Sequence, residues 1–240
     1  MLSSIPSLVR EAEGYLIALL DTARDAKEIA QLQADLATQI IPRAVSPIVI
    51  PLRDGLNPDA LLDDRARVHF DADGTALDRE WTWISNAAAW LVYDAHHTGR
   101  ITSALQLFGN VTFLLFWDNG YQALRALDDD GDGALRGHEL DGLALWHDVN
   151  HNGVSDAREV RALSEWHIVA LSTRHEVDTE NAAYLASSSA GVTFADGSTR
   201  PTYDILLRAR RPEWWSPGEN SPSECRRLCE ESAPAHLLGT

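Results

Sequence analysis

The chain has 240 residues, of which 45% are hydrophobic, and its formal net charge is −16. This length and apolar content suffice for a domain with a sizeable core, while the negative charge argues against nucleic acid or an anionic membrane as a partner. The longest apolar run, 111–117, is far shorter than the roughly 18 residues of a membrane span. We therefore expect a folded protein without a transmembrane segment.

The N-terminal part of the chain predicts a long helix. Ser7 can serve as its N-cap, Pro42 ends the pattern, and between them apolar residues recur along one face at helical spacing. Such a helix packs on its own domain, self-associates or recruits a protein partner, and the sequence leaves these alternatives open. The first residues lack a basic start followed by an apolar core. We expect no signal peptide, so that the protein is cytoplasmic or is exported by a signal-peptide-independent route.

Composition divides the chain into three parts. We expect the helix at 1–42, the main domain at 43–211, and a flexible tail at 212–240 that is rich in Pro, Ser and Glu. The tail holds both cysteines, Cys225 and Cys229, which are too few for a disulfide framework and whose role the sequence leaves open.

Short strands are expected at the start of the main domain, at 47–51 and 91–94. The loop that begins at Asp94 keeps the outline of a calcium loop. However, His96 and Thr98 stand at its third and fifth positions, where calcium favours carboxylate and amide oxygens. We expect this loop to keep its shape without binding an ion.

Residues 128–139 fill the EF-hand loop pattern D-x-[DN]-x-[DN]-G-x5-E. A hard cation such as Ca²⁺ takes about six to eight oxygen ligands, which short acidic side chains, a backbone carbonyl and a bidentate Glu supply in turn. The ligands expected in this first loop are Asp128, Asp130, Asp132, the carbonyl of Ala134, and Glu139. Taken alone, the loop could also be an acidic surface turn.

The pattern recurs at 148–159, which makes chance an unlikely explanation for both loops. The ligands expected in this second loop are Asp148, Asn150, Asn152, the carbonyl of Val154, and Glu159. We therefore expect two Ca²⁺ ions. The first loop should bind more tightly, because two of the side chains in the second are neutral Asn, unless Asp156 at the ninth position assists through a water.

The spacing of the two loops predicts a single helix that leaves the first and enters the second, at 139–147. Either ion would fix one end of this shared helix, so we expect positive cooperativity. Further elements are a helix at 113–127, a short helix at 160–166, a strand at 168–172, an exposed loop at 177–190 and a hairpin formed by 191–194 and 203–207. The expected fold class is α+β: a long N-terminal helix, then EF-hand-like tandem calcium loops that share a helix, packed with short β-strands and hairpins.

Several short segments, in order and spacing, resemble a known family. They are 70–74 (FDADG), 91–94 (LVYD), 106–109 (QLFG), 119–124 (NGYQAL) and 143–146 (LALW), followed by the second loop. Residues 47–172 resemble the EF-hand-like calcium-binding module of repeats-in-toxin (RTX) proteins, including the self-processing module of iron-regulated bacterial RTX proteins. In those self-processing relatives, calcium orders the fold and an Asp-Pro bond at the start of the module is cleaved.

The chain departs from that pattern at the bond itself. Ser46-Pro47 stands where the resemblance places Asp-Pro, and none of the ten prolines follows an Asp. We therefore expect no self-cleavage. The expected function is a non-enzymatic calcium-binding protein, in which calcium stabilises or switches the fold. The alternatives are a calcium-dependent (self-)processing module that acts on Asp-Pro bonds, and a partner-recruiting module in which calcium is structural.

Overall fold

We analysed a computed structural model. Within it, the residues described are 26, 27, 30, 31, 45–74, 79–115, 117–178, 180, 181 and 183–209. The chain divides into two units, one of residues 45–210 and one of residues 1–44 with 211–240. Most of the expected N-terminal helix therefore lies outside the described residues, although the four described there are helical and exposed. The expected tail lies wholly outside them.

The described part of the unit at 45–210 consists mainly of β-strands. They are β1 (Ile48–Pro51), β2 (Leu62–Phe70), β3 (Arg79–Ile84), β4 (Ala88–Tyr93), β5 (Ala134–Arg136), β6 (Leu143–Trp146), β7 (Val160–Ala162), β8 (Ile168–Ser172), β9 (Glu176–Val177), β10 (Tyr184–Phe194) and β11 (Thr199–Ile205). The α-helix of this unit is α3 (Gly120–Arg125). The 3₁₀ helices are η1 (Pro58–Leu61), η2 (Ala104–Gln106), η3 (Thr112–Leu114), η4 (Gly137–Leu140) and η5 (Leu163–Trp166). No helix among the described residues is long and apolar enough to cross a membrane.

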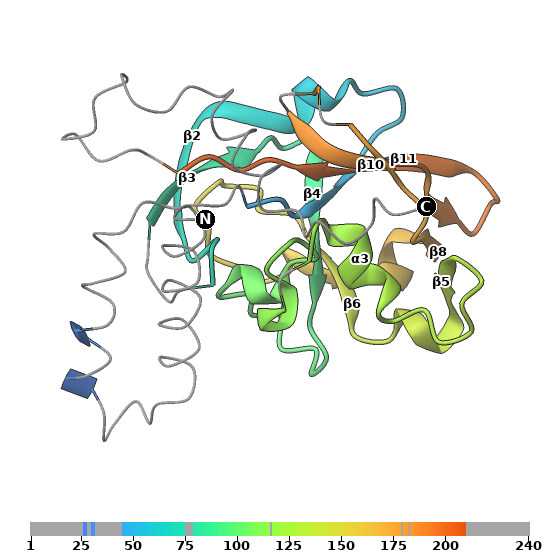
Figure 1. The fold of residues 1–240 in the computed structure, drawn as a ribbon, viewed down its shortest axis with the longest axis horizontal. Coiled ribbons are helices and arrows are strands. Elements are labelled where there is room, and N and C mark those ends of the chain that lie inside the picture. The colour runs from blue at the N-terminus through green and yellow to red at the C-terminus, as the bar shows by residue number, and fades with distance from the viewer. Residues whose placement is uncertain are drawn as a thin grey trace, which may run out of the picture. The chain divides into compact units, whose positions relative to one another are not determined.

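The strands form one large sheet and one small one (Figure 1). The large sheet has the order β5-β8-β10-β11-β1-β4-β6-β7, with β9 paired to β10, and the small sheet consists of β2 and β3. Neighbouring strands run antiparallel throughout both sheets. β5, which lies inside the first predicted calcium loop, and β7, which directly follows the second, lie at opposite ends of the strand order.

This architecture contradicts the predicted α+β class with EF-hand helices. The predicted shared helix at 139–147 is instead η4 followed by β6, and β6 pairs on one side with β4 and on the other with β7. The predicted helix at 113–127 shortens to α3, preceded by η3. The predicted short helix at 160–166 divides into β7 and η5.

The expected strands are found, but part of an expected loop is also a strand. β1, β4 and β8 lie at the expected positions, and β10 and β11 form the expected hairpin. Residues 177–190 were expected to be an exposed loop, but β10 already begins at Tyr184. The small residues of this stretch, Ser187 and Ser188, pair with Tyr203 and Thr202 of β11, so the lack of large apolar side chains does not prevent sheet formation.

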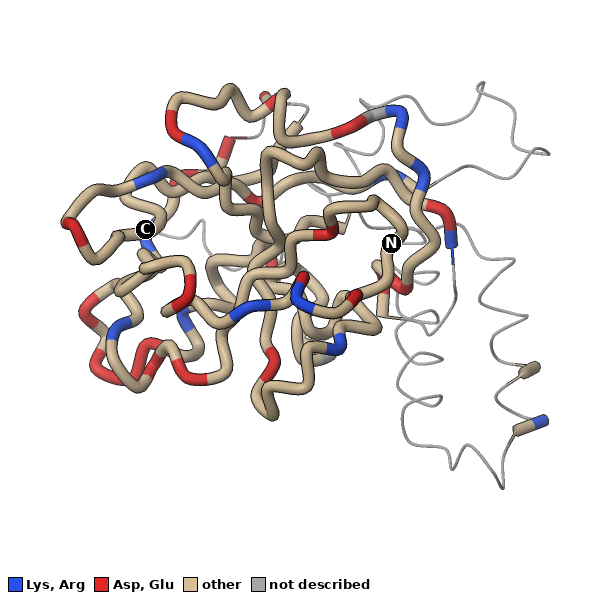
Figure 2. The backbone as a smooth tube through the Cα atoms, turned by 180° about the vertical axis from the view of Figure 1, so that it is seen from behind, with Lys and Arg blue, Asp and Glu red and all other residues tan. Residues whose placement is uncertain are grey.

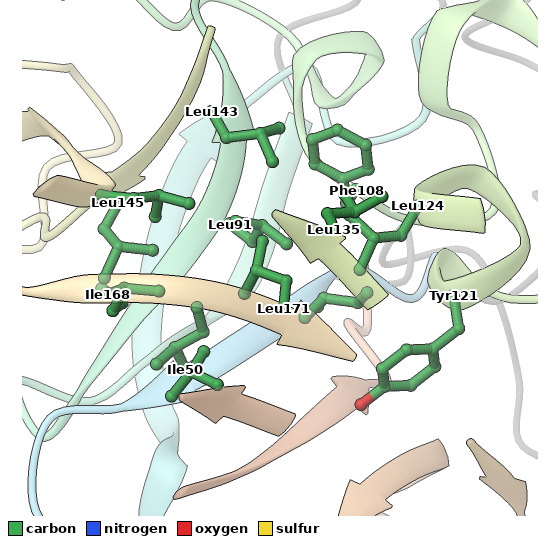
Figure 3. Close-up of a cluster of buried hydrophobic side chains, with 14 of the residues drawn as sticks. Ile50, Leu91, Phe108, Tyr121, Leu124, Leu135, Leu143, Leu145, Ile168 and Leu171 are labelled. Carbon is green, nitrogen blue, oxygen red and sulfur yellow. The ribbon is translucent and has the colours of Figure 1, made fainter. Parts of the chain in front are cut away.

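A hydrophobic core lies against one face of the large sheet. Figure 3 shows Leu91, Leu135 and Leu171 meeting at its centre. Tyr121 of α3 closes one side, with its hydroxyl directed away from the leucines and 2.9 Å from the Oγ1 atom of Thr202. The core therefore holds α3, and with it the chain that enters the first predicted loop, against the sheet.

A second cluster consists of aromatic side chains. The ring of Trp83, on β3, lies 5.1 Å from that of Trp90 on β4 and 5.6 Å from that of Trp146 on β6. Phe70, at the end of β2, lies 5.3 Å from the ring of Trp83. These edge-on contacts fix the small sheet against the large one. Trp146 stands two residues before Asp148, so the cluster also lies beside the second predicted loop.

Candidate metal centre

The first loop runs from the end of α3 to η4, with β5 inside it. The carboxylate of Asp128 accepts a hydrogen bond from the amide N–H of Gly133 at 3.0 Å, and Asp130 accepts one from the amide of Asp132 at 3.0 Å. Asp132 in turn accepts one from the amide of Ala134 at 2.8 Å. The three aspartates are thus fixed by the turn that they help to form. Figure 2 shows acidic residues gathered in this loop.

Glu139 closes the first loop from η4. One carboxylate oxygen accepts from the amide of Asp129 and the other from the amide of Arg136, both at 2.8 Å. The hydrogen bond from Arg136 is the largest influence on Glu139, and it and the other amides lower the pKa of this carboxyl despite the opposing effect of burial. Glu139 is therefore held as a carboxylate at the twelfth position.

The arrangement fits a divalent cation. Ligand atoms of Asp128, Asp130 and Glu139 all lie within 4.8 Å of one another. The Oδ1 atom of Asp128 is buried and has no hydrogen-bond partner, which is costly for a carboxylate oxygen unless a cation neutralises it. The structure thus brings together these three predicted ligands of the first loop. Asp132 and Ala134 lie on the same turn, with side chains that are more exposed than that of Glu139.

The second loop repeats this hydrogen-bond scheme position by position. Asp148 accepts from the amide of Gly153 at 2.9 Å, as Asp128 does from Gly133. Asn152 donates its amide to Asn150 at 3.0 Å and accepts from the amide of Val154 at 2.8 Å. Two loops of different sequence therefore place positions one, three, five, six and seven in the same relation.

Glu159 occupies the twelfth position of the second loop as Glu139 does in the first. Its two oxygens accept from the amides of Val149 and Asp156, at 3.0 and 3.1 Å. Asp156 also accepts hydrogen bonds from the side-chain amides of Asn150 and Asn152, at 2.8 and 3.0 Å. The ninth position therefore contributes a carboxylate on the side of the loop where the two neutral Asn side chains lie.

The second loop differs from the first in its surroundings. The indole N–H of Trp83 donates to Asp148 at 2.7 Å, and the indole N–H of Trp146 lies 3.4 Å from Glu159. Asp148 is 1% exposed. Burial raises the pKa of Asp148, although the hydrogen bonds from Gly153 and Trp83 act in the opposite direction. A buried carboxylate with a raised pKa is stabilised strongly by a nearby cation.

The first loop has basic and hydroxyl neighbours that the loop pattern did not predict. Arg136 forms an ion pair with Asp132, and a guanidinium nitrogen of Arg174 donates to the carbonyl of Asp132 at 2.9 Å. Thr173 directs its hydroxyl toward Asp128 at 3.4 Å. These groups come from β5 and from the segment after β8. Only the ion pair, with its spacing of four residues, could have been suspected from the sequence.

The loop at Asp94 has the expected shape. Asp94 accepts hydrogen bonds from the amide of Thr98 at 2.9 Å and from the amide of Gly99 at 2.7 Å. Burial acts to raise the pKa of Asp94, but these amides prevail and lower it. The eighth residue of this loop, Ile101, donates its amide to the hydroxyl of Ser155, the eighth residue of the second loop, at 2.8 Å. The second loop is therefore paired with the loop at Asp94, not with the first loop.

Fold and loops together define a class of protein: a β-sheet domain with tandem acidic loops, of which the first holds a cluster fit for a metal ion. The SPM domain family matches residues 53–208, and the chain belongs to this family. It is 31% identical over 147 residues to the iron-regulated protein FrpA of Neisseria meningitidis serogroup C. This confirms the predicted relation to the self-processing module of such proteins. The match covers 58% of this chain but only 13% of FrpA, so the chain corresponds to a small part of that protein.

Proposed function

We propose that this SPM domain is a calcium-assembled module of the self-processing type. In this proposal one Ca²⁺ ion binds in each of the two loops and completes the fold around the buried segment that precedes β1. The carrying observation is the hydrogen-bond scheme shared by both loops, together with the unpartnered buried oxygen of Asp128.

The residues proposed to hold the ions are those of the loop pattern. They are Asp128, Asp130, Asp132, the carbonyl of Ala134 and Glu139 for the first ion, and Asp148, Asn150, Asn152, the carbonyl of Val154 and Glu159 for the second. A bound ion supplies positive charge where carboxylates converge, and it performs no chemistry on a substrate. We propose no multiple-turnover activity, so that any processing is a single event on the chain's own backbone.

Calcium would act mainly on the links between elements. The first loop joins α3 to β5 and η4, and the second joins β6 to β7. Without a cation, the acidic side chains of each loop repel one another. Binding to the folded state alone stabilises it by about 2.7 kcal/mol per site when free calcium is 100 times the dissociation constant. We therefore expect calcium to raise the unfolding temperature markedly.

Isothermal titration calorimetry on the full chain, after removal of metal with EDTA, tests this proposal. We expect a stoichiometry of two. The double variant Glu139→Gln with Glu159→Gln should weaken binding at both sites, whereas Glu165→Gln, the same change at an exposed position outside the loops, should leave both unchanged. A stoichiometry of zero or three for the unchanged protein would refute the proposal.

The self-processing reading is favoured by the position of Ser46 and Pro47. Ser46 is fully buried, and its amide donates to the side-chain oxygen of Asn110 at 3.2 Å. The carbonyl of Pro47 accepts from the amide of Ile205 at 3.0 Å. The Ser46-Pro47 segment, which the sequence resemblance aligns with the processed Asp-Pro bond and which precedes the family match at 53–208, is thus held inside the fold.

A further inference from the structure

The hydroxyl of Ser46 lies next to a buried carboxyl group that takes no part in either loop. Its Oγ atom donates to the Oδ2 atom of Asp204, on β11, at 3.2 Å. Both residues are fully buried, and the Oδ1 atom of Asp204 has no hydrogen-bond partner. Burial raises the pKa of Asp204 well above that of an ordinary aspartate. Once ionised, this carboxylate is therefore a stronger base than usual.

The peptide bond before Ser46 is held by neighbours on both of its polar atoms. The carbonyl oxygen of Val45 accepts a hydrogen bond from the amide of Leu207 at 2.8 Å. The amide of Ser46 donates to Asn110 at 3.2 Å. An amide donor directed at a carbonyl oxygen stabilises the negative charge that develops there when a nucleophile attacks. The Val45–Ser46 bond thus has a hydroxyl, a base and an oxyanion donor around it.

The geometry of serine makes the carbonyl before it the reachable target. Attack of Oγ on the carbonyl carbon of Val45 closes a five-membered ring, whereas attack on serine's own carbonyl carbon would close a strained four-membered one. A nucleophilic hydroxyl needs an adjacent base, and Asp204 is the group placed to serve as that base. The reaction suited to these residues therefore differs from cleavage after an Asp, and the expectation of no self-cleavage, which was based on the missing Asp-Pro bond, does not apply to it.

We propose that the Val45–Ser46 peptide bond is a self-cleavage site, with Ser46 as nucleophile and Asp204 as general base. The Oγ–C bond forms as the Oγ proton passes to Asp204. The C–N bond then breaks, and the nitrogen of Ser46 takes that proton. The product is an ester between Val45 and the Ser46 hydroxyl, with a free amine on Ser46. One water molecule hydrolyses the ester, giving a carboxylate on Val45 and restoring the hydroxyl.

This inference rests on the proposed function, because α3 connects the first loop to the cleavage site. The amide of Gly120, at the start of α3, donates to the Oδ2 atom of Asp204 at 3.2 Å. The helix ends at Arg125, three residues before Asp128. An ion in the first loop would fix the far end of this short helix, and with it the donor to Asp204. We therefore expect cleavage to depend on calcium.

The test is intact-mass spectrometry on the full chain, purified in EDTA and then incubated with calcium. We expect two fragments, 1–45 and 46–240, whose masses together exceed that of the chain by one water. Ser46→Ala should abolish the cleavage, and Asp204→Asn should slow it about 100-fold or more, which is the usual contribution of a general base. Ser198→Ala is the matched control, because Ser198 donates to Asp196 at 2.6 Å in an exposed turn; it should change nothing.

A second variant keeps the test decisive if Ser46→Ala or Asp204→Asn fails to fold. Ser46→Cys should form a thioester at Val45, which hydroxylamine cleaves to a hydroxamate of fragment 1–45. An unchanged intact mass of the native chain, and of this variant after hydroxylamine treatment, in calcium that calorimetry shows to be bound, would overturn the cleavage and leave calcium binding intact. A break after Ser46, or equal cleavage of a folded Ser46→Ala variant, would also overturn it. Cleavage without calcium binding would overturn the proposed function instead.

Discussion

Replacement of Glu139 by Gln tests whether the two loops bind calcium independently of each other. The two carboxylate oxygens of Glu139 each accept one backbone amide at 2.8 Å, and Gln offers only one acceptor oxygen. The variant loses one hydrogen bond to a charged group, a contribution of about 1.5–3 kcal/mol, together with the negative charge that faces the ion. The hydrogen bond stabilises the loop with or without the ion, whereas the lost charge acts on the bound ion, so affinity at the first loop should decrease at least tenfold, a difference of about 1.4 kcal/mol.

The second loop should bind calcium unchanged in this variant. The sequence predicted that a shared helix would couple the sites, but β6 pairs with β4 and β7 and is buried along its length. We therefore expect the order of β6 to depend on this pairing more than on the ion in the first loop. Calorimetry on Glu139→Gln should therefore show one weakened site and one site whose affinity is within about twofold of the original, a difference of about 0.4 kcal/mol. A tenfold loss at the second site would refute this reasoning.

Other predictions concern the second loop. Trp83→Phe removes the indole donor to Asp148 and should lower the free energy of unfolding in EDTA by about 1.5–3 kcal/mol more than Trp81→Phe does. Trp81 is the control because its indole nitrogen has no hydrogen-bond partner. Equal values for the two variants in urea unfolding would contradict this prediction. Acidification should release calcium from the second loop first. Burial raises the pKa of Asp148, whereas hydrogen bonds lower the pKa of the twelfth-position glutamate of the first loop. Affinity is lost as the pH falls through each pKa, and calorimetry at decreasing pH measures the order of release. Gly153→Ala places a Cβ atom against the Val68 side chain of β2 at a φ of +71°. Thermal unfolding should show that this variant melts at a lower temperature than Gly131→Ala, which has the same φ and open space around it.

Burial alone does not decide which strands the sequence predicts, because the buried β1 and β4 were expected whereas the equally buried β6 was not. β6 places Leu143 and Leu145 in the main core and Trp146 in the aromatic cluster, on its opposite face. The strand therefore reads as a continuous apolar run without alternation. Such a run, next to an EF-hand pattern, favoured a helix. The segment forms a strand instead because it pairs with β4 and β7, and sequence spacing does not show this pairing.

The loops themselves could be predicted because their contacts are local. Each hydrogen bond of the twelve-residue scheme joins residues within ten positions of each other. The partners from elsewhere could not be predicted in this way. Trp83 lies 65 residues before Asp148, and Thr173 lies 45 residues after Asp128. The same holds for Ser46 and Asp204, which are 158 residues apart and meet only because β1 and β11 are neighbours in the sheet.

In the loop at Asp94, protein donors converge on the carboxylate at the first position. The amides of Thr98 and Gly99 and the hydroxyl of Thr98 all donate to the Asp94 carboxylate and hold the turn in shape. Through Ile101 this turn also positions Ser155, within the neighbouring loop. If the two acidic loops bind calcium as proposed, metal dependence could be removed one loop at a time while the backbone path is kept. A chain with the same architecture could be tuned to respond to calcium at two loops, at one, or at none.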